Sequence, residues 1–277
     1  MTTVLPWLDK TARAQVVARL KNTASMEIEK RHWGTMAKGS SPGGGLRLYI
    51  LDIRGLFLVA GVLRYTLRFH ASGVLYRGQC RDWQLQPSLL RDANTKREIS
   101  SRLTWLTSAL AGIESLFDPI GTADEREALA QHYGLPTRWL DVVDNVQTAA
   151  WFAYHRSPTD PPGRDDSVRY IYALAYPLAG GAATALDLRL KSSEWLRPHI
   201  QQAWCVRASD AMTNLGRLSH LHLATFIVPR PLLAEWCSLS ALPPHVMLPN
   251  AIEDSGLRYW QRAQDSLKAK GLLPVPW

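Results

Sequence analysis

The chain has 277 residues, of which 46% are hydrophobic and 20% charged, and this composition predicts a soluble globular protein that can bury a full core. Its three cysteines are odd in number and far apart, which argues against a disulfide framework and for reduced thiols. The most apolar stretch, residues 46–63, is interrupted by Arg47, Asp52 and Arg54, which disfavours a membrane span. With no secretory signal visible, we expect a cytoplasmic protein without a membrane partner.

The net charge of +8 is unevenly distributed along the chain. The first hundred residues hold 16 Lys and Arg against 7 Asp and Glu, whereas the remaining 177 hold 16 against 17. A basic surface attracts polyanions without sequence preference. We therefore expect either DNA or RNA as a partner of the basic N-terminal third, or a solvated basic surface that maintains colloidal stability.

The N-terminal residues are predicted to form a segment of their own. Residues 10–31 have the pattern of a basic amphipathic helix, and the glycine-rich stretch 34–45 follows as the best boundary candidate. This stretch lacks the Gly-Lys-Ser/Thr ending of a phosphate-binding loop. We expect a basic helical segment and linker over residues 1–45, and one domain over residues 46–277.

A strand and several capped helices are predicted next. Residues 74–76 are predicted to form a short strand, with Arg77 at its end. Two capping boxes, Thr95 with Glu98 and Thr122 with Glu125, each open a helix.

The second of these helices should run to Tyr133, with Gly134 in the left-handed position that ends it and Pro136 blocking continuation. Asp144 should start another helix, which runs from Asn145 to about residue 156.

The last part of the chain is richer in strands. Strands are predicted over 168–174, 203–207 and 223–228, and a final helix around 257–267 should be closed by Gly271. Helices thus dominate the N-terminal half, and no regular alternation of strand and helix occurs. These patterns favour an α+β fold with a mixed or antiparallel sheet over a doubly wound α/β fold.

One segment concentrates polar side chains more than any other, and it runs Gln131-His132-Tyr133-Gly134-Leu135-Pro136-Thr137-Arg138-Trp139-Leu140-Asp141. Together with Tyr76-Arg77-Gly78-Gln79, it resembles the FRG family, named for a Phe/Tyr-Arg-Gly motif. A third family motif fits Arg197 to Cys205 with Ala in place of Gly and Cys in place of Phe. The resemblance covers about residues 70–208.

The FRG pattern in turn resembles the layout of the ADP-ribosyltransferase fold, and this implies NAD as co-substrate, with no metal. By resemblance, Arg77 would grip NAD, residues 137–141 would form the second motif, and Gln201 or Gln202 the third. The resemblance implies a toxin or phage-defence effector that modifies nucleic acid or protein, with an antitoxin or partner protein possible.

The usual glutamate is missing from the third motif, since the nearest is Glu194. Either another carboxylate such as Asp141 substitutes for it, or the chain is a non-enzymatic module that binds nucleotide or nucleic acid.

Each candidate residue also has a structural interpretation. The planar guanidinium of Arg77 suits a phosphate, and Gly78 would leave the backbone open to a ligand, but Arg77 could instead pair with Asp141. His132 could titrate against a ligand or simply favour the helix C-terminus. Thr137 could donate to a ligand or cap the turn.

Arg138 could contact an anion or be solvated, and Asp141 could be catalytic or buried and paired. Gln131 could anchor the loop. The predicted catalytic residues are His132, Thr137, Asp141 and Gln201, and the predicted cofactor-binding residues are Tyr76, Arg77, Gly78, Gln79 and Arg138. His220 and His222 lack a third ligand at suitable spacing, so no metal is expected. Trp33, Trp83 and Trp139 adjoin polar motif residues and are candidate stacking platforms.

Overall fold

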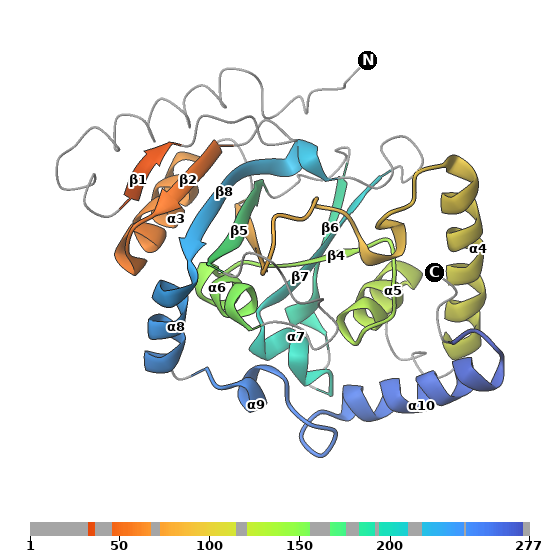
Figure 1. Ribbon diagram of the computed structural model, residues 1–277. Coiled ribbons are helices and arrows are strands. Elements are labelled where there is room, and N and C mark those ends of the chain that lie inside the picture. Colours follow the sequence, from red (N-terminus) through yellow and green to blue (C-terminus); the bar gives the residue numbers. More distant parts are fainter. Residues whose placement is uncertain are drawn as a thin grey trace. The chain divides into compact units, whose positions relative to one another are not determined.

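The computed structural model describes residues 33–36, 46–67, 73–114, 121–155, 167–175, 183–191, 194–209, 218–240 and 242–273 (Figure 1). They form helices and strands without regular alternation, so the predicted α+β class is confirmed. The predicted helix over 10–31 and most of the glycine-rich stretch lie outside the described residues.

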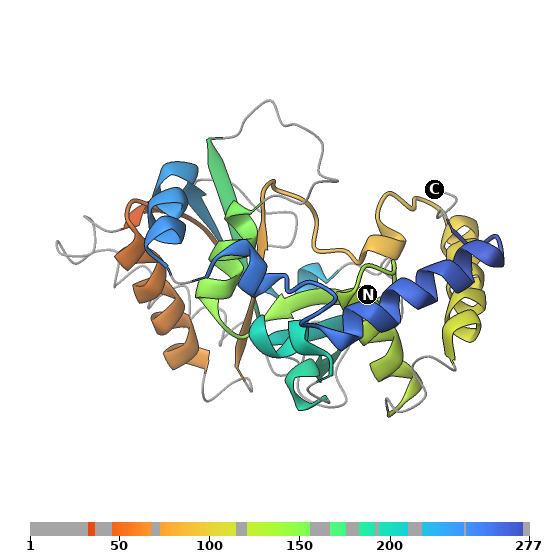
Figure 2. The ribbon, with the colours of Figure 1, turned by 90° about the horizontal axis from the view of Figure 1, so that it is seen from below.

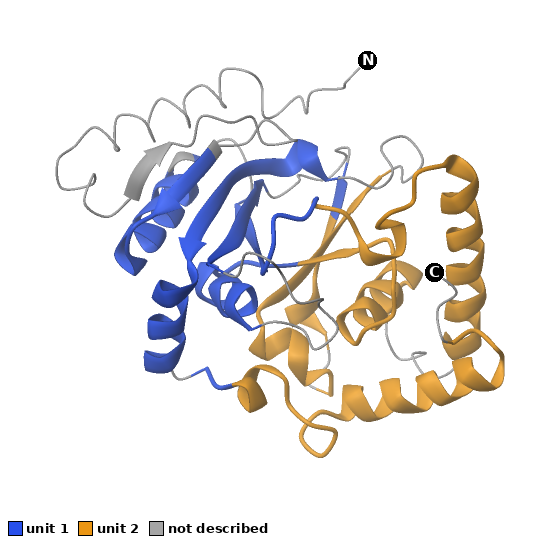
Figure 3. Cartoon of the chain, in the orientation of Figure 1, with its two compact units in different colours: residues 1–84, 142–184, 218–243 blue, residues 85–141, 185–217, 244–277 orange. Residues whose placement is uncertain are grey.

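The chain divides into two compact units, each assembled from three separate segments (Figure 3). Unit 1 comprises residues 1–84, 142–184 and 218–243, and unit 2 comprises residues 85–141, 185–217 and 244–277.

Unit 1 is built on a mixed sheet (Figure 1). Its strands follow the order β1 (Trp33–Met36), β2 (Leu46–Ile50), β8 (His222–Pro229), β5 (Val168–Ala175) and β3 (Val74–Gln79), with β4 (Leu140–Val143) next to β3. β2 and β8 are parallel, while β8 with β5 and β5 with β3 are antiparallel. β4 enters unit 1 with its second half, where Val143 pairs with Tyr76.

Helices α3 (Ile53–Leu67) and α6 (Val146–Tyr154) pack against one face of this sheet, and α8 (Arg230–Leu239) contacts both of these helices and β8. Side chains alternate between the two faces of a strand, so Tyr76 and Gly78 share one face and Arg77 points to the other. The Tyr76 hydroxyl donates to the Ala60 carbonyl of α3 at 3.3 Å. The face of Tyr76 and Gly78 is therefore the helix-covered face.

Gly78 is needed for this packing. A Cβ at Gly78 would lie 1.8 Å from the Ala149 carbonyl oxygen and 2.6 Å from the Ala153 nitrogen, both in α6. The missing side chain thus lets the backbone of α6 approach β3. We had predicted that Gly78 would open the backbone to a ligand, and α6 takes up that space instead.

Three helices enclose the core of unit 2. α4 (Lys96–Ile113), α5 (Ala123–His132) and α10 (Ser255–Ala269) share a buried cluster that includes Leu106, Leu129 and Trp260. α10 lies beside α4 in both views (Figures 1 and 2). Both predicted capping boxes are present, at Thr95 with Glu98 and Thr122 with Glu125.

A second cluster in unit 2 surrounds its strands, whose order is β4, β7 (Ala203–Ala208) and β6 (Ala183–Asp187). Trp139, Leu188 and Cys205 are fully buried in this cluster. The short helices α7 (Leu196–Ile200) and α9 (Pro244–Met247) complete the unit. The three strands predicted over 168–174, 203–207 and 223–228 are confirmed as β5, β7 and β8.

Among the described residues, no helix combines the length and apolar character needed to cross a membrane.

Candidate functional site

The polar segment in unit 2 begins where α5 ends. Gly134 has φ +111°, its N–H donates to the Gln131 carbonyl at 2.9 Å, and the Leu135 N–H donates to the Ala130 carbonyl at 3.0 Å. This pair of bonds is the helix ending that favours glycine at the left-handed position, as the sequence predicts. Leu135 is buried, which fixes the direction in which the chain leaves the helix.

Gln131 is the centre of the hydrogen bonds in this segment. Its amide oxygen accepts from the Thr137 N–H at 3.1 Å, from the Thr137 hydroxyl at 3.0 Å and from the Ser88 hydroxyl at 3.3 Å. Its amide nitrogen donates to Asp141 Oδ2 at 3.1 Å. One side chain therefore joins the helix end, the turn and the start of β4.

Thr137 is fully buried within the loop. Besides donating to Gln131, its hydroxyl accepts from the Trp139 N–H at 3.1 Å. Thr137 was expected either to donate to a ligand or to cap the turn, and these hydrogen bonds agree with the capping role.

Asp141, which accepts from Gln131, keeps 34% of its side chain exposed. Its Oδ1 lies 3.7 Å from His132 Nδ1 and accepts from the Cys205 thiol at 3.5 Å. The His132 side chain is only 6% exposed, and neither ring nitrogen has a hydrogen-bond partner among the described residues. Gln131, His132 and Cys205 thus surround the partly exposed carboxylate of Asp141.

Arg138 is held by acidic side chains of α5. Its backbone N–H and its Nε both donate to Glu127 Oε1 at 3.0 Å, and its Nη2 also bonds to Glu127. The hydrogen bond to Glu127 raises the pKa of Arg138 above its ordinary value despite partial burial. Arg207 pairs with Asp124 at 2.6 Å and lies over the ring of Trp139, 4.8 Å from its centroid. Trp139 is fully buried, so the prediction that it is an accessible stacking platform is wrong.

The third motif packs onto the second motif within unit 2. The Arg197 guanidinium lies 5.2 Å from the centroid of the Tyr133 ring, and its Nε is 3.6 Å from Asp254 Oδ2. Asp254 is fully buried and accepts from the Tyr133 hydroxyl at 2.9 Å. The Gln201 amide donates to the Met247 carbonyl at 2.6 Å and is almost fully buried, so it fastens α9 to α7.

Sequence reasoning missed two buried acids that organise this site. Glu127 could have been found, because it is one turn before Gln131 on a helix whose boundaries were predicted correctly. The contact of Asp254 could not be predicted from local spacing, since Asp254 is 121 residues from its partner Tyr133.

The first motif lies on β3 in unit 1. Arg77 is the fourth of six strand residues rather than the end of the strand, because Gly78 and Gln79 continue the pairing with β5. The Gln79 amide donates to the Trp83 carbonyl at 3.2 Å. Tyr172 is the cross-strand neighbour of Arg77, so both point to the face that α3 and α6 leave uncovered.

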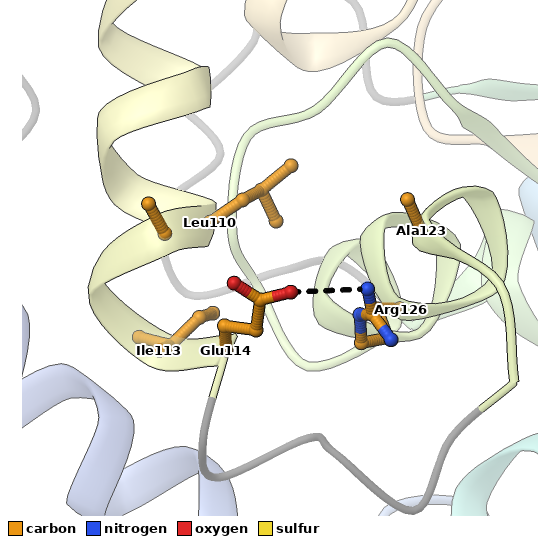
Figure 4. Close-up of a pocket in the computed structure, with 6 residues that line it drawn as sticks. Leu110, Ile113, Glu114, Ala123 and Arg126 are labelled. Atoms are coloured by element: carbon orange, nitrogen blue, oxygen red, sulfur yellow. Dashed lines mark hydrogen bonds and ion pairs between the residues drawn. The ribbon is translucent and has the colours of Figure 1, made fainter.

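Two further features bear on ligand binding. A pocket between α4 and α5 is lined by Leu110, Ala111, Ile113, Glu114, Ala123 and Arg126, with Glu114 and Arg126 paired at 3.3 Å (Figure 4). None of these six is a predicted site residue. Within the part of the chain that the structure describes, no group of three His, Cys, Asp or Glu residues is arranged to hold a metal ion.

In the comparison with protein families, the FRG domain model matches residues 72–161. The matched residues include both principal motifs, with Arg77 and the segment from Gln131 to Asp141, whereas the third motif lies beyond them. No curated protein and no solved structure matches the chain.

Proposed function

We propose that this protein is an NAD-dependent ADP-ribosyltransferase that modifies nucleic acid or protein. The observation that carries the proposal is the carboxylate of Asp141. It is partly exposed, Gln131 orients one of its oxygens, and His132 lies 3.7 Å from the other. A positioned carboxylate beside a histidine supplies negative charge and a proton acceptor at one place.

The reaction requires both of these. The bond between C1 of the ribose and the nicotinamide nitrogen breaks, and its electron pair leaves with nicotinamide. The ribose passes through an oxocarbenium-like cation, which a nearby carboxylate stabilises. An oxygen or nitrogen of the acceptor then bonds to C1 and releases a proton, which the partly exposed Asp141 carboxylate can accept, with His132 Nδ1 3.7 Å from its Oδ1.

Asp141 supports this role better than the third-motif residue does. The amide of Gln201 is buried and donates to the Met247 carbonyl, whereas Asp141 keeps about a third of its side chain exposed. We propose that Asp141 substitutes for the glutamate that is missing from the third motif. The FRG resemblance extends the proposal to Arg77 as a ligand of the NAD phosphates, and to a role as a toxin or phage-defence effector.

The test measures nicotinamide release and transfer of label from labelled NAD by the purified protein. Asp141→Asn keeps the shape and its hydrogen bond to Gln131 but loses the charge, so turnover should fall by about a hundredfold or more. Asp265→Asn, which removes an exposed acid on α10, should leave turnover unchanged.

Two results would argue against the proposal. Turnover in Asp141→Asn equal to that of the unaltered protein would remove Asp141 from the chemistry. NAD binding without any turnover in the unaltered protein would identify a non-enzymatic nucleotide-binding module instead.

A further inference from the structure

Helix α3 of unit 1 exposes apolar side chains on the side that faces away from the sheet. Its inner side packs through three fully buried residues, Leu56, Val59 and Leu63. On the outer side, Leu58 is 45% exposed and Tyr65 is 49% exposed. Tyr65 follows Leu58 by two helical turns, so the two lie on one line along the helix with Gly61 between them. These three residues form the α3 stripe.

Gly61 has no packing role among the described residues. It lies in the middle of α3, it is exposed, and a Cβ at this position would meet no atom within 4 Å. A glycine inside a helix destabilises it relative to alanine. Whereas Gly78 makes room for α6, the space at Gly61 is open to solvent. This gap between Leu58 and Tyr65 can receive a side chain of an approaching helix.

Two arginines border the α3 stripe. Arg54 is one turn before Leu58 and Arg64 is next to Tyr65, and both are exposed. Neither arginine forms a hydrogen bond or an ion pair with a described residue. α3 holds no acidic residue, and Asp52, just before it, accepts a backbone N–H of the first turn at 2.8 Å. The stripe is therefore apolar, with a positive charge towards each end.

Helix α8 adds an aromatic border along one side of the stripe. Trp236 packs edge-to-face on Phe57, with the ring centroids 6.4 Å apart, and both side chains are half-buried. The charged residues of α8 are Arg230 and Glu235, one of each sign, so this helix adds no net charge. An exposed apolar surface that is rimmed by charged residues is typical of a protein-binding site.

We propose that the α3 stripe binds an amphipathic helix of a partner protein, one that carries aliphatic side chains with acidic residues beside them. The aliphatic side chains would cover Leu58 and Tyr65 and fill the space over Gly61. The carboxylates would pair with Arg54 and Arg64, because a planar guanidinium binds a carboxylate through two parallel hydrogen bonds.

Charge disfavours two other occupants of the stripe. A second copy of the chain would bring the same two arginines to the interface, without an acidic residue of α3 to pair with them. Residues 10–31 hold six Lys and Arg against two Glu, so they are repelled as well. Binding at the stripe involves neither NAD nor Asp141, and the surface therefore goes beyond the proposed function.

The experiment selects displayed helical peptides on the full chain. The peptides have about eighteen residues, which is longer than the stripe, and their positions are varied among Leu, Ala, Glu and Lys. Those that also bind the Leu58→Glu variant are discarded. The retained peptides should carry leucines at helical spacing with glutamates beside them. The tightest is then labelled, and its binding is measured by fluorescence anisotropy at several salt concentrations.

Three variants test the parts of the surface. Leu58→Ala should weaken binding of the peptide by about tenfold, because one buried aliphatic contact is lost. Arg54→Gln should weaken it by about threefold at low salt and by less at high salt. Gly61→Leu should also weaken it by about tenfold or more, because the new side chain fills the space that the peptide needs, although it adds apolar surface. Leucine favours the helix, so this variant should fold.

Matched controls come from unit 2. Ile252→Ala removes an aliphatic side chain that is 87% exposed, and Arg97→Gln removes an exposed arginine of α4. Both variants should bind the peptide as the unaltered protein does. Circular dichroism melting of all variants separates a loss of contact from a loss of fold.

Four outcomes would overturn the proposal. Selection could retain no peptide, or peptides with lysines in place of the glutamates. Gly61→Leu could bind more tightly, which would indicate unspecific apolar attraction. A dimer that Leu58→Glu dissociates would identify a second copy as the occupant. Adsorption to phosphatidylserine vesicles that Leu58→Glu abolishes would identify a membrane surface. Because nicotinamide release is measured separately, failure here leaves the transferase proposal intact.

Discussion

Glu127, buried in α5, binds both the backbone N–H and the guanidinium of Arg138, so a single carboxylate fixes the backbone and the side chain of one residue. The Glu127 side chain is only 1% exposed, whereas that of Arg138 is 36% exposed. Arg138 therefore has a structural role whether or not it also reaches a ligand: it connects the loop after α5 to the helix itself.

Replacing Glu127 by Gln should destabilise the protein by about 1.5–3 kcal/mol, because the neutral amide loses the charge-assisted hydrogen bonds that Glu127 makes with Arg138. Glu114→Gln is the matched control, since the Glu114 side chain is 61% exposed and pairs with Arg126 at the surface. That change should cost less than about 1 kcal/mol. Equal midpoints in urea for the two variants would contradict the role given to Glu127.

Gly78→Ala should destabilise unit 1 by about 2 kcal/mol or more, because the added carbon would overlap the Ala149 carbonyl of α6. Gly61→Ala, in the middle of α3, meets no atom within 4 Å and should stabilise the protein by up to about 1 kcal/mol. Thermal unfolding of the two variants should therefore shift in opposite directions. A neutral Gly78→Ala would mean that α6 does not pack closely against β3.

Gly134→Val should destabilise by more than about 1 kcal/mol, because a β-branched residue resists the φ of +111° that ends α5. The nearest atom to a Cβ at Gly134 is 4.0 Å away, so backbone conformation rather than crowding is being tested. Gly134→Asn should cost less than the valine change, since asparagine tolerates positive φ better. An unshifted thermal midpoint for the valine variant would rule this out.

Arg77→Lys keeps the positive charge and loses the planar fork, so affinity for NAD should fall by about 1–3 kcal/mol. Arg64→Lys, an exposed arginine on α3, provides the control. Calorimetry that gives the same dissociation constant for Arg77→Lys and for the unaltered protein would exclude Arg77 from the phosphate site.

Cys237 should react slowly with iodoacetamide near neutral pH. Burial raises the pKa of its thiol to about 11. At pH 8 the reactive thiolate is then about 0.1% of the total, against about 10% for a thiol with an ordinary pKa near 9. Alkylation of the Cys237 peptide, followed by mass spectrometry, should therefore speed up on unfolding in urea at pH 8. It should also speed up in the folded protein as the pH rises towards 11.

Local features of the fold could be predicted from the sequence. Both capping boxes and the glycine that ends α5 depend on residues at most five positions apart, so their spacing alone specifies them. The strand of Arg77 was predicted to end too early, because Gly78 reads as a break. The position of this strand in the sheet depends on its contacts with α6 and β5, and these contacts cannot be predicted from the local sequence.

The candidate site could be predicted in part, for the same reason. The polar segment from Gln131 to Asp141 was identified from its composition, and the roles of its members were left open. Thr137 and Arg138 are fixed by Gln131 and Glu127, while Asp141 keeps 34% of its side chain exposed. Which polar residue of a motif stays accessible depends on packing between distant segments, such as the contact of Cys205 with Asp141.

The segmented make-up of unit 1 constrains how the chain can be synthesised and divided. β8 lies between β2 and β5, although about 170 residues separate it from β2 in the sequence. During translation, β2 and α3 emerge long before the strand that must join them, so this sheet can close only after residue 229 has left the ribosome. A fragment limited to residues 72–161 would retain β3 but lose β5, leaving one edge of β3 open to aggregation. We therefore expect proteolysis or gene truncation within residues 168–229 to abolish folding of unit 1 as a whole rather than release an independently stable fragment.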